Sequence, residues 1–140
     1  MSREGTARWR AWWLPCLYMA GIFVLSSFHL DLTIDESVPF RDKGIHFLEY
    51  AVLGFLCANA TRRSFPDRPA WRTFAVGAFV ATAWGLGDEL HQAFVPGRSA
   101  EILDWVADTL GSVTGAGVRF ALNRWNASSS RKVEPAEESQ

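Results

Sequence analysis

Ionisable side chains recur at helical intervals in three stretches of the chain. Lys43, His46 and Tyr50 follow one another at i, i+3 and i+7, so on a helix they would share one stripe. Asp104 and Asp108 are four residues apart and would likewise share one face. Mixed cations and carboxylates of this kind suit proton transfer or the binding of a polar group. The candidate site residues are Lys43, His46, Glu49, Tyr50, Asp88, Glu89, Gln92, Arg98, Asp104 and Asp108.

Four apolar blocks must position these side chains. Residues 11–30 contain no Asp, Glu, Lys or Arg, and a helix of that length spans roughly 30 Å, the thickness of a bilayer's hydrocarbon core. Further blocks at 44–61, about 71–90 and about 102–122 hold few charges. The sequence therefore predicts an all-α integral membrane bundle of four transmembrane helices.

The positive charges predict an orientation for these four helices. Eleven of the 14 Lys and Arg residues lie before the first block, from the end of the second block to Arg72 at the start of the third, or from Arg119 near the end of the fourth block onward. This excess is the positive-inside pattern, so both termini are expected on the cytoplasmic side. A soluble helical bundle with unusually apolar helices is the alternative, and the repeated charge asymmetry argues against it.

Length and composition narrow the class of protein further. The 140 residues allow one domain, and a net charge of −1 excludes a strongly basic nucleic-acid binder. Two cysteines without C-x-x-C spacing exclude a disulfide scaffold and give no sign of a zinc site. We expect a cytoplasmic segment at 1–10, the membrane domain at 11–122, and a polar, disordered cytoplasmic tail at 123–140.

Three interpretations of the polar residues stay open. The first is a structural ion-pair cluster, which can fix helix register without a ligand. The second is a metal site, since the pairs at i, i+3 offer His and carboxylate ligands. The third is a pocket for the polar head of an amphiphile, and no cofactor is expected. The candidate metal ligands are His46, Glu49, Asp88 and His91, and the third histidine, His29, falls at the same predicted helix ends.

Two further expectations concern packing. Gly111 and Gly115 form a small-xxx-small surface that would let another helix approach closely. Glu49 would lie roughly 9 Å deeper than Lys43, where desolvation favours its neutral form. We expect Glu49 to pair with His46 or with a cation from another helix, or to stay protonated.

The same stretches resemble the VanZ-like family of small bacterial membrane proteins. The matching segments are DKGIHFLEYAVLGFL at 42–56 and DELHQAFVPGRSAEILDWVADTLGSVTG at 88–115, with a Ser-Ser pair at Ser26 and Ser27. At the position of Asp108 the family more often has Asn. The family's motif residues correspond here to Lys43, His46, Glu49, Tyr50, Asp88, Glu89, Gln92, Pro96, Arg98, Asp104 and Gly111.

The resemblance implies a multi-pass protein of the bacterial cytoplasmic membrane. It also implies a part in envelope lipid handling or in tolerance of the glycopeptide teicoplanin, without an established reaction. Two functions stay open: acting on an envelope lipid or lipid-linked wall precursor, or a non-catalytic module that binds a lipid or a partner. The expected partner is the lipid bilayer, not nucleic acid, and the oligomeric state is open.

Overall fold

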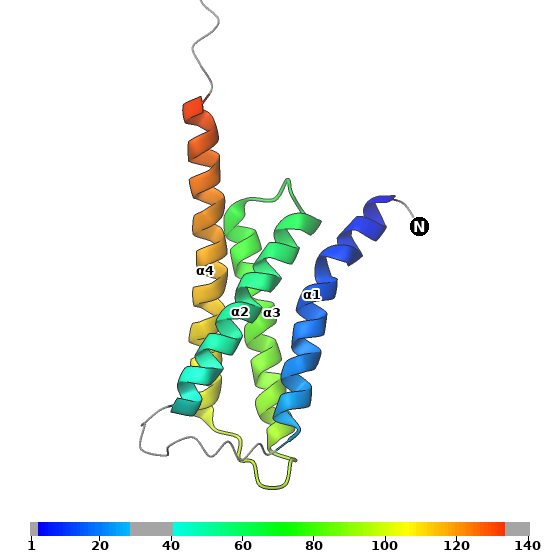
Figure 1. Ribbon diagram of the computed structural model, residues 1–140, viewed down its shortest axis with the longest axis vertical. Coiled ribbons are helices and arrows are strands. Elements are labelled where there is room, and N and C mark those ends of the chain that lie inside the picture. The colour runs from blue at the N-terminus through cyan, green and yellow to red at the C-terminus, as the bar shows by residue number, and fades with distance from the viewer. Residues whose placement is uncertain (1–2, 29–40, 134–140) are drawn as a thin grey trace, which may run out of the picture.

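The computed structural model describes residues 3–28 and 41–133, which form an all-α bundle. Its helices are α1 (Arg3–Ser26), α2 (Arg41–Ser64), α3 (Ala70–Gln92) and α4 (Ile102–Val133). Successive helices run in opposite directions, so α2 and α4 are parallel to each other (Figure 1). α2, α3 and α4 pack against one another, whereas α1 contacts only α2 and, to a smaller extent, α3.

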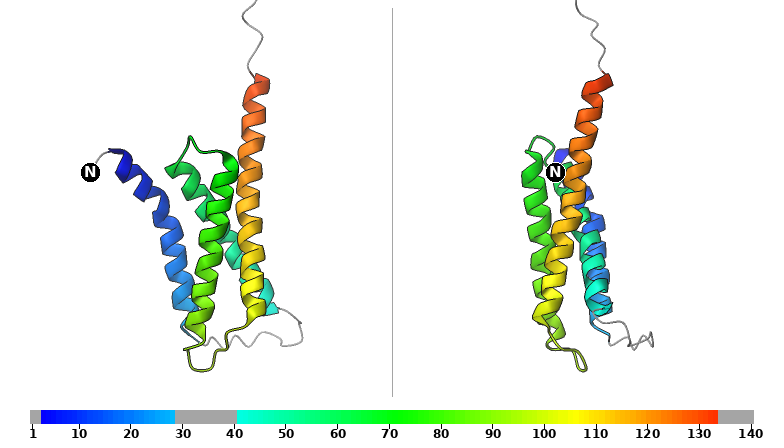
Figure 2. Two further views of the ribbon diagram at one scale, coloured as in Figure 1. Left: turned by 180° about the vertical axis from the view of Figure 1, so that it is seen from behind. Right: turned by 90° about the vertical axis from the view of Figure 1, so that its left-hand side faces the viewer.

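Proline and glycine separate the helices. Pro66 and Pro69 lie between α2 and α3, and the extended backbone of Pro69 (φ −54°, ψ 142°) directly precedes the first residue of α3. In the α3–α4 connection, Gly97 follows Pro96 and has a φ of 82°, a conformation that side-chain-bearing residues rarely adopt. Pro15 lies inside α1, whose N-terminal part leans away from α2 and α3 (Figure 2).

Small residues allow α2 and α4 to approach closely. A Cβ atom added at Gly111 would overlap the backbone oxygen of Phe47, and one added at Gly115 would overlap that of Ala51. Gly54 of α2 faces the backbone of Ser112 in the same way. The expectation of a close helix approach at Gly111 and Gly115 is therefore confirmed.

The distribution of polarity is the reverse of that in most globular proteins. The buried positions hold alanines, glycines and several acids, while large apolar side chains point outward all round the bundle. Phe79 on α3 is 73% exposed and Ile102 on α4 is 80% exposed, for example. No helix in the described part of the chain combines the length and the apolar character needed to cross a membrane.

The C-terminal part of α4 differs from our expectation. We expected a disordered tail from residue 123, but α4 continues as a helix to Val133 and projects beyond the other helices (Figure 1). The physical reason is that no glycine or proline interrupts the sequence between Gly117 and Pro135, so an established helix can propagate. Residues 134–140 lie outside the described residues.

Matched alanine substitutions test the close approach of α2 and α4. Gly111→Ala should destabilise the fold by about 1–3 kcal/mol, because its Cβ meets backbone that cannot move without separating two helices. Gly87→Ala is the control, since a Cβ there meets nothing within 4 Å, and it should stabilise by about 0.5–1 kcal/mol through helix propensity. Thermal unfolding of the purified variants measures both, and equal effects would contradict this packing.

Candidate functional site

Lys43 of α2 is an ion-pair centre at the end of the bundle where α2 and α4 begin, which we call the acidic end. Its Nζ lies 2.8 Å from Asp104 Oδ1, 3.0 Å from Glu101 Oε2 and 3.2 Å from Asp42 Oδ2. The Asp104 side chain is only 9% exposed, whereas that of Asp42 is 63% exposed. Lys43 therefore links the polar stripe of α2 to the acidic face of α4.

The charge of Lys43 follows from these contacts. Hydrogen bonds to Asp104 and then to Glu101 raise the pKa of the Lys43 ammonium above its ordinary value. A raised pKa in the folded state means that this stabilisation is complete below the ordinary lysine pKa and is lost only in strong alkali. Lys43 is therefore a cation throughout the neutral range.

His46, one turn further along α2, meets the second carboxylate of α4. Its Nδ1 lies 3.0 Å from Oδ1 of Asp108, whose side chain is fully buried. The other oxygen, Oδ2, has no hydrogen-bond partner, and neither has the hydroxyl of the buried Tyr50 beside it. Gly85 of α3 leaves room for both, since a Cβ there would lie 3.0 Å from Asp108 Oδ2 and from the Tyr50 ring.

Glu89 brings α3 into the same cluster. Its Oε2 accepts a hydrogen bond from the backbone N–H of Glu101 at 2.9 Å, just before α4 begins. Its Oε1 is buried without a partner. The ligand atoms of His46, Glu89 and Asp108 all lie within 4.8 Å of one another, and we call these three residues the His-Glu-Asp cluster.

A second polar network joins α1 to α3. Asp88 accepts hydrogen bonds from Ser26 Oγ at 2.6 Å and from Gln92 Nε2 at 2.9 Å. Gln92 Oε1 in turn accepts one from Arg98 at 2.9 Å, so Arg98 folds back over the end of the helices.

An open pocket of about 390 Å³ lies between α1, α2 and α3 at the acidic end. Its wall is both apolar and charged. The lining residues are Ile22, Leu25, Ser26, Asp42, Ile45, His46, Glu49, Asp88, Gln92 and Arg98.

Glu49 does not have the partner that its spacing suggested. His46 contacts Asp108 rather than Glu49, because its ring points towards α4. Among the described residues, no hydrogen bond or ion pair reaches the Glu49 carboxylate, which lines the pocket beside His46. Its place in the pocket wall leaves it available to a ligand.

The proposed metal-ligand set from the sequence is not assembled as a group. His91 lies 3.0 Å from Ser27 Oγ and packs its ring 4.3 Å from that of Phe23. Only His46 of that set belongs to the group of potential ligands found among the described residues. The third histidine, His29, lies outside the described residues.

Spacing within one helix did not indicate three contacts of the site. Ser26 and Ser27 both bond back to the backbone oxygen of Phe23 in their own helix, but Ser26 also contacts Asp88 and Ser27 also contacts His91. Glu101, which contacts Lys43, was not singled out. Its position three residues before Asp104 was the available signal.

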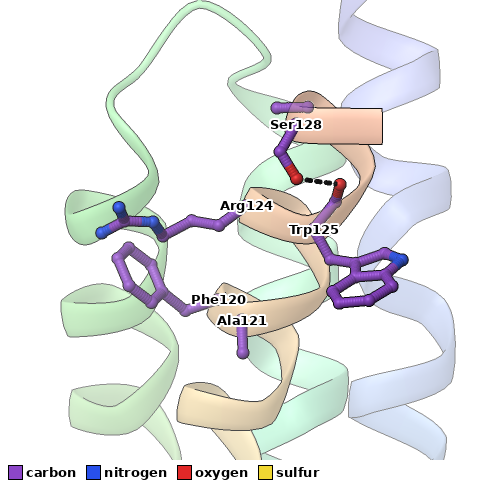
Figure 3. A pocket seen from close by; sticks show the side chains of 6 residues that line it. Phe120, Ala121, Arg124, Trp125 and Ser128 are labelled. Atoms are coloured by element: carbon purple, nitrogen blue, oxygen red, sulfur yellow. Dashed lines mark hydrogen bonds between the residues drawn. The ribbon is translucent and has the colours of Figure 1, made fainter. Parts of the chain in front are cut away.

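The opposite end of the bundle holds a hollow of about 520 Å³ formed by α4 alone. Phe120 and Arg124 point to one side of the helix and Trp125 to the other (Figure 3). The Arg124 guanidinium lies 6.0 Å from the centre of the Phe120 ring. Carboxylates and histidines are absent from its wall, so the acidic end is the candidate site.

The VanZ/LLP1 family profile matches residues 12–123, and the chain belongs to this family. The match covers the residues of the pocket and of the His-Glu-Asp cluster. No curated protein and no solved structure matches the chain significantly.

Removing the ammonium of Lys43 should destabilise the fold. Lys43→Met leaves the largely buried Asp104 without its cation, and we expect a loss of about 2–4 kcal/mol in the free energy of unfolding. Asp42→Asn breaks a contact of the same lysine at an exposed carboxylate and should change stability by less than about 0.5 kcal/mol. Thermal unfolding of both variants is the measurement, and equal losses would contradict this ranking.

Proposed function

We propose that this chain crosses the bacterial cytoplasmic membrane four times with both termini in the cytoplasm. We further propose that its acidic end faces outward and binds the polar head of an envelope amphiphile. The observation on which the binding proposal rests is the pocket between α1, α2 and α3, whose wall combines apolar and charged side chains. Such a wall suits a molecule with a polar head and a hydrocarbon chain.

The membrane location is supported by the distribution of side chains. The acids Asp88, Glu89 and Asp108 face the interior of the bundle, and large apolar side chains cover its outside. In water this would leave an extensive apolar surface exposed, whereas in lipid it is the expected arrangement. The inward-facing acids also lower the apolar character of α3 and α4 without facing lipid.

The orientation is supported by the positive side chains. Arg62 and Arg63 lie in the last turn of α2, and Arg68 and Arg72 lie just before and in the first turn of α3. All four are therefore at the end of the bundle opposite the acidic end, as is Arg124 in the C-terminal half of α4. An excess of arginines marks the cytoplasmic side of a membrane protein. The acidic end and its pocket then face the outside.

The charge of the pocket wall selects a class of head group. Three carboxylates, those of Asp42, Glu49 and Asp88, line the pocket with the single guanidinium of Arg98. An excess of carboxylates favours a head group that carries an amine, and Arg98 can accompany a phosphate beside it. A zwitterionic aminophospholipid or an amine-bearing lipid-linked precursor has this chemistry.

A purely structural role is the second candidate. A continuous series of hydrogen bonds from Ser26 through Asp88 and Gln92 to Arg98 favours this role, because these groups already serve as one another's partners. In that case the module is non-catalytic and the polar residues hold the helices in register. Glu49, which has no such partner, distinguishes the two candidates.

Reporter fusions test the topology. A reporter active only outside the cytoplasm should be active when fused after Ser99, between α3 and α4, and inactive when fused after Ser64 or Ser129. The reason is that Ser99 lies at the acidic end and the other two positions at the opposite end. External activity of the Ser64 fusion would refute the proposed orientation.

Lipid titration of the purified chain tests the pocket. We expect saturable binding of phosphatidylethanolamine, weaker binding of the anionic phosphatidylglycerol, and at least about a tenfold loss of phosphatidylethanolamine affinity in Glu49→Gln, since a charge-assisted contact is worth about 1.5–3 kcal/mol. Arg124→Gln, at the opposite end of the bundle, is the control and should bind as the wild type does. Native mass spectrometry counts the bound lipids.

Equal affinity in wild type and Glu49→Gln would leave the structural role as the remaining candidate. A contribution to teicoplanin tolerance belongs to the same proposal, because its basis is the handling of an envelope amphiphile. Teicoplanin sensitivity of cells that carry the wild-type or the Glu49→Gln chain gives the cellular readout.

A further inference from the structure

The His-Glu-Asp cluster places three potential metal ligands from three different helices in one small volume. His46 comes from α2, Glu89 from α3 and Asp108 from α4, and their ligand atoms lie within 4.8 Å of one another. Only His46 also lines the pocket, so the cluster is a separate feature between α2, α3 and α4. Ligands bound about 2.1 Å from a tetrahedral ion lie about 3.4 Å apart, which small side-chain movements would reach here.

Two carboxylate oxygens of the cluster have no hydrogen-bond partner. Asp108 is 0% exposed and its Oδ2 is unpaired, and Glu89 is 6% exposed with Oε1 unpaired. A buried carboxylate oxygen without a partner is costly, because burial has removed the water that would solvate it. These atoms therefore indicate that something further binds between the helices.

The charge balance indicates what that is. Lys43 already pairs with Asp42, Glu101 and Asp104. Among the described residues, Asp108 pairs only with His46, and Glu89 has no ion pair. Two buried carboxylates thus face a single imidazole. A divalent cation held by one oxygen of each carboxylate would compensate both charges.

We propose that His46, Glu89 and Asp108 bind one first-row divalent transition-metal ion of the Zn²⁺ class. One imidazole nitrogen and two carboxylate oxygens are ligands of this class, whereas Mg²⁺ and Ca²⁺ prefer oxygen alone. Binding displaces the proton that His46 and Asp108 share across their 3.0 Å contact and releases it to solvent.

The surroundings of the cluster hold its ligands in place. The backbone N–H of Glu101 orients the Glu89 carboxylate through Oε2 and leaves Oε1 directed elsewhere. Gly85 preserves space beside Asp108, where any side chain would press on Oδ2. Such supporting contacts are characteristic of sites that bind metal with defined geometry.

Zinc titration of the full-length chain, purified without a histidine tag and stripped with a chelator, tests this site. We expect one Zn²⁺ per chain after gel filtration, and a thermal midpoint that rises with Zn²⁺ concentration. Asp108→Asn, Glu89→Gln and His46→Gln should each weaken Zn²⁺ binding by at least about tenfold. His91→Gln, which removes a histidine at the same end of the bundle but outside the cluster, should change it less than twofold.

The outcomes separate the alternatives. Absence of stoichiometric Zn²⁺ in the wild type would overturn the site and leave a proton shared between the buried carboxylates as the compensation. Equal weakening by His91→Gln, or unchanged binding in the three cluster variants, would also overturn it. If a cluster variant fails to fold, the wild type decides: replacement of Zn²⁺ by Co²⁺ should give the visible absorption of a tetrahedral or five-coordinate ion, and a spectrum of free hexaaqua Co²⁺ would refute the site. None of these readouts depends on lipid binding.

Discussion

The close approach of α2 and α4 is the constraint on which the rest of the structure depends. Gly111 lies against the backbone of Phe47, and this contact sets the register of two parallel helices. One turn nearer the helix starts, the same register places Asp108 beside His46, 62 positions apart in sequence. One turn further it places Asp104 beside Lys43, 61 positions apart. A glycine contact thus decides which charges meet.

The close packing also explains why the bundle can bury so much polarity. With alanines and glycines between the helices, little apolar volume is available in the interior, and the acids fill the space at one end. Their burial is tolerable only because Lys43, His46, Ser26 and the backbone of Glu101 supply partners. At Glu89 and Asp108 the second carboxylate oxygen has no partner, and this is where we place the proposed metal ion.

The lengths of the apolar blocks predicted the four helices, and helical spacing predicted which polar residues share a face, because both depend on neighbours within one helix. It could not predict which faces meet. Glu49 is one turn from His46, yet the imidazole points across the helix boundary to Asp108. Ser26 on α1 bonds back to Phe23 of its own helix at 3.1 Å, but its shorter contact, at 2.6 Å, is with Asp88 on α3. The continuation of α4 beyond residue 123 was missed because polarity was taken as disorder, although no helix-breaking residue follows until Pro135.

Because the helices are synthesised one after another, the packing of α1 affects how the bundle folds. A ribosome makes α1 first, but its partners are α2 and α3, so α1 must wait for both before it has a complete surface to bind. Lys43 and His46 emerge earlier, whereas Asp104 and Asp108 belong to α4. The charged centre can therefore be completed only when α4 arrives, and until then Lys43 and His46 have no carboxylate from α4.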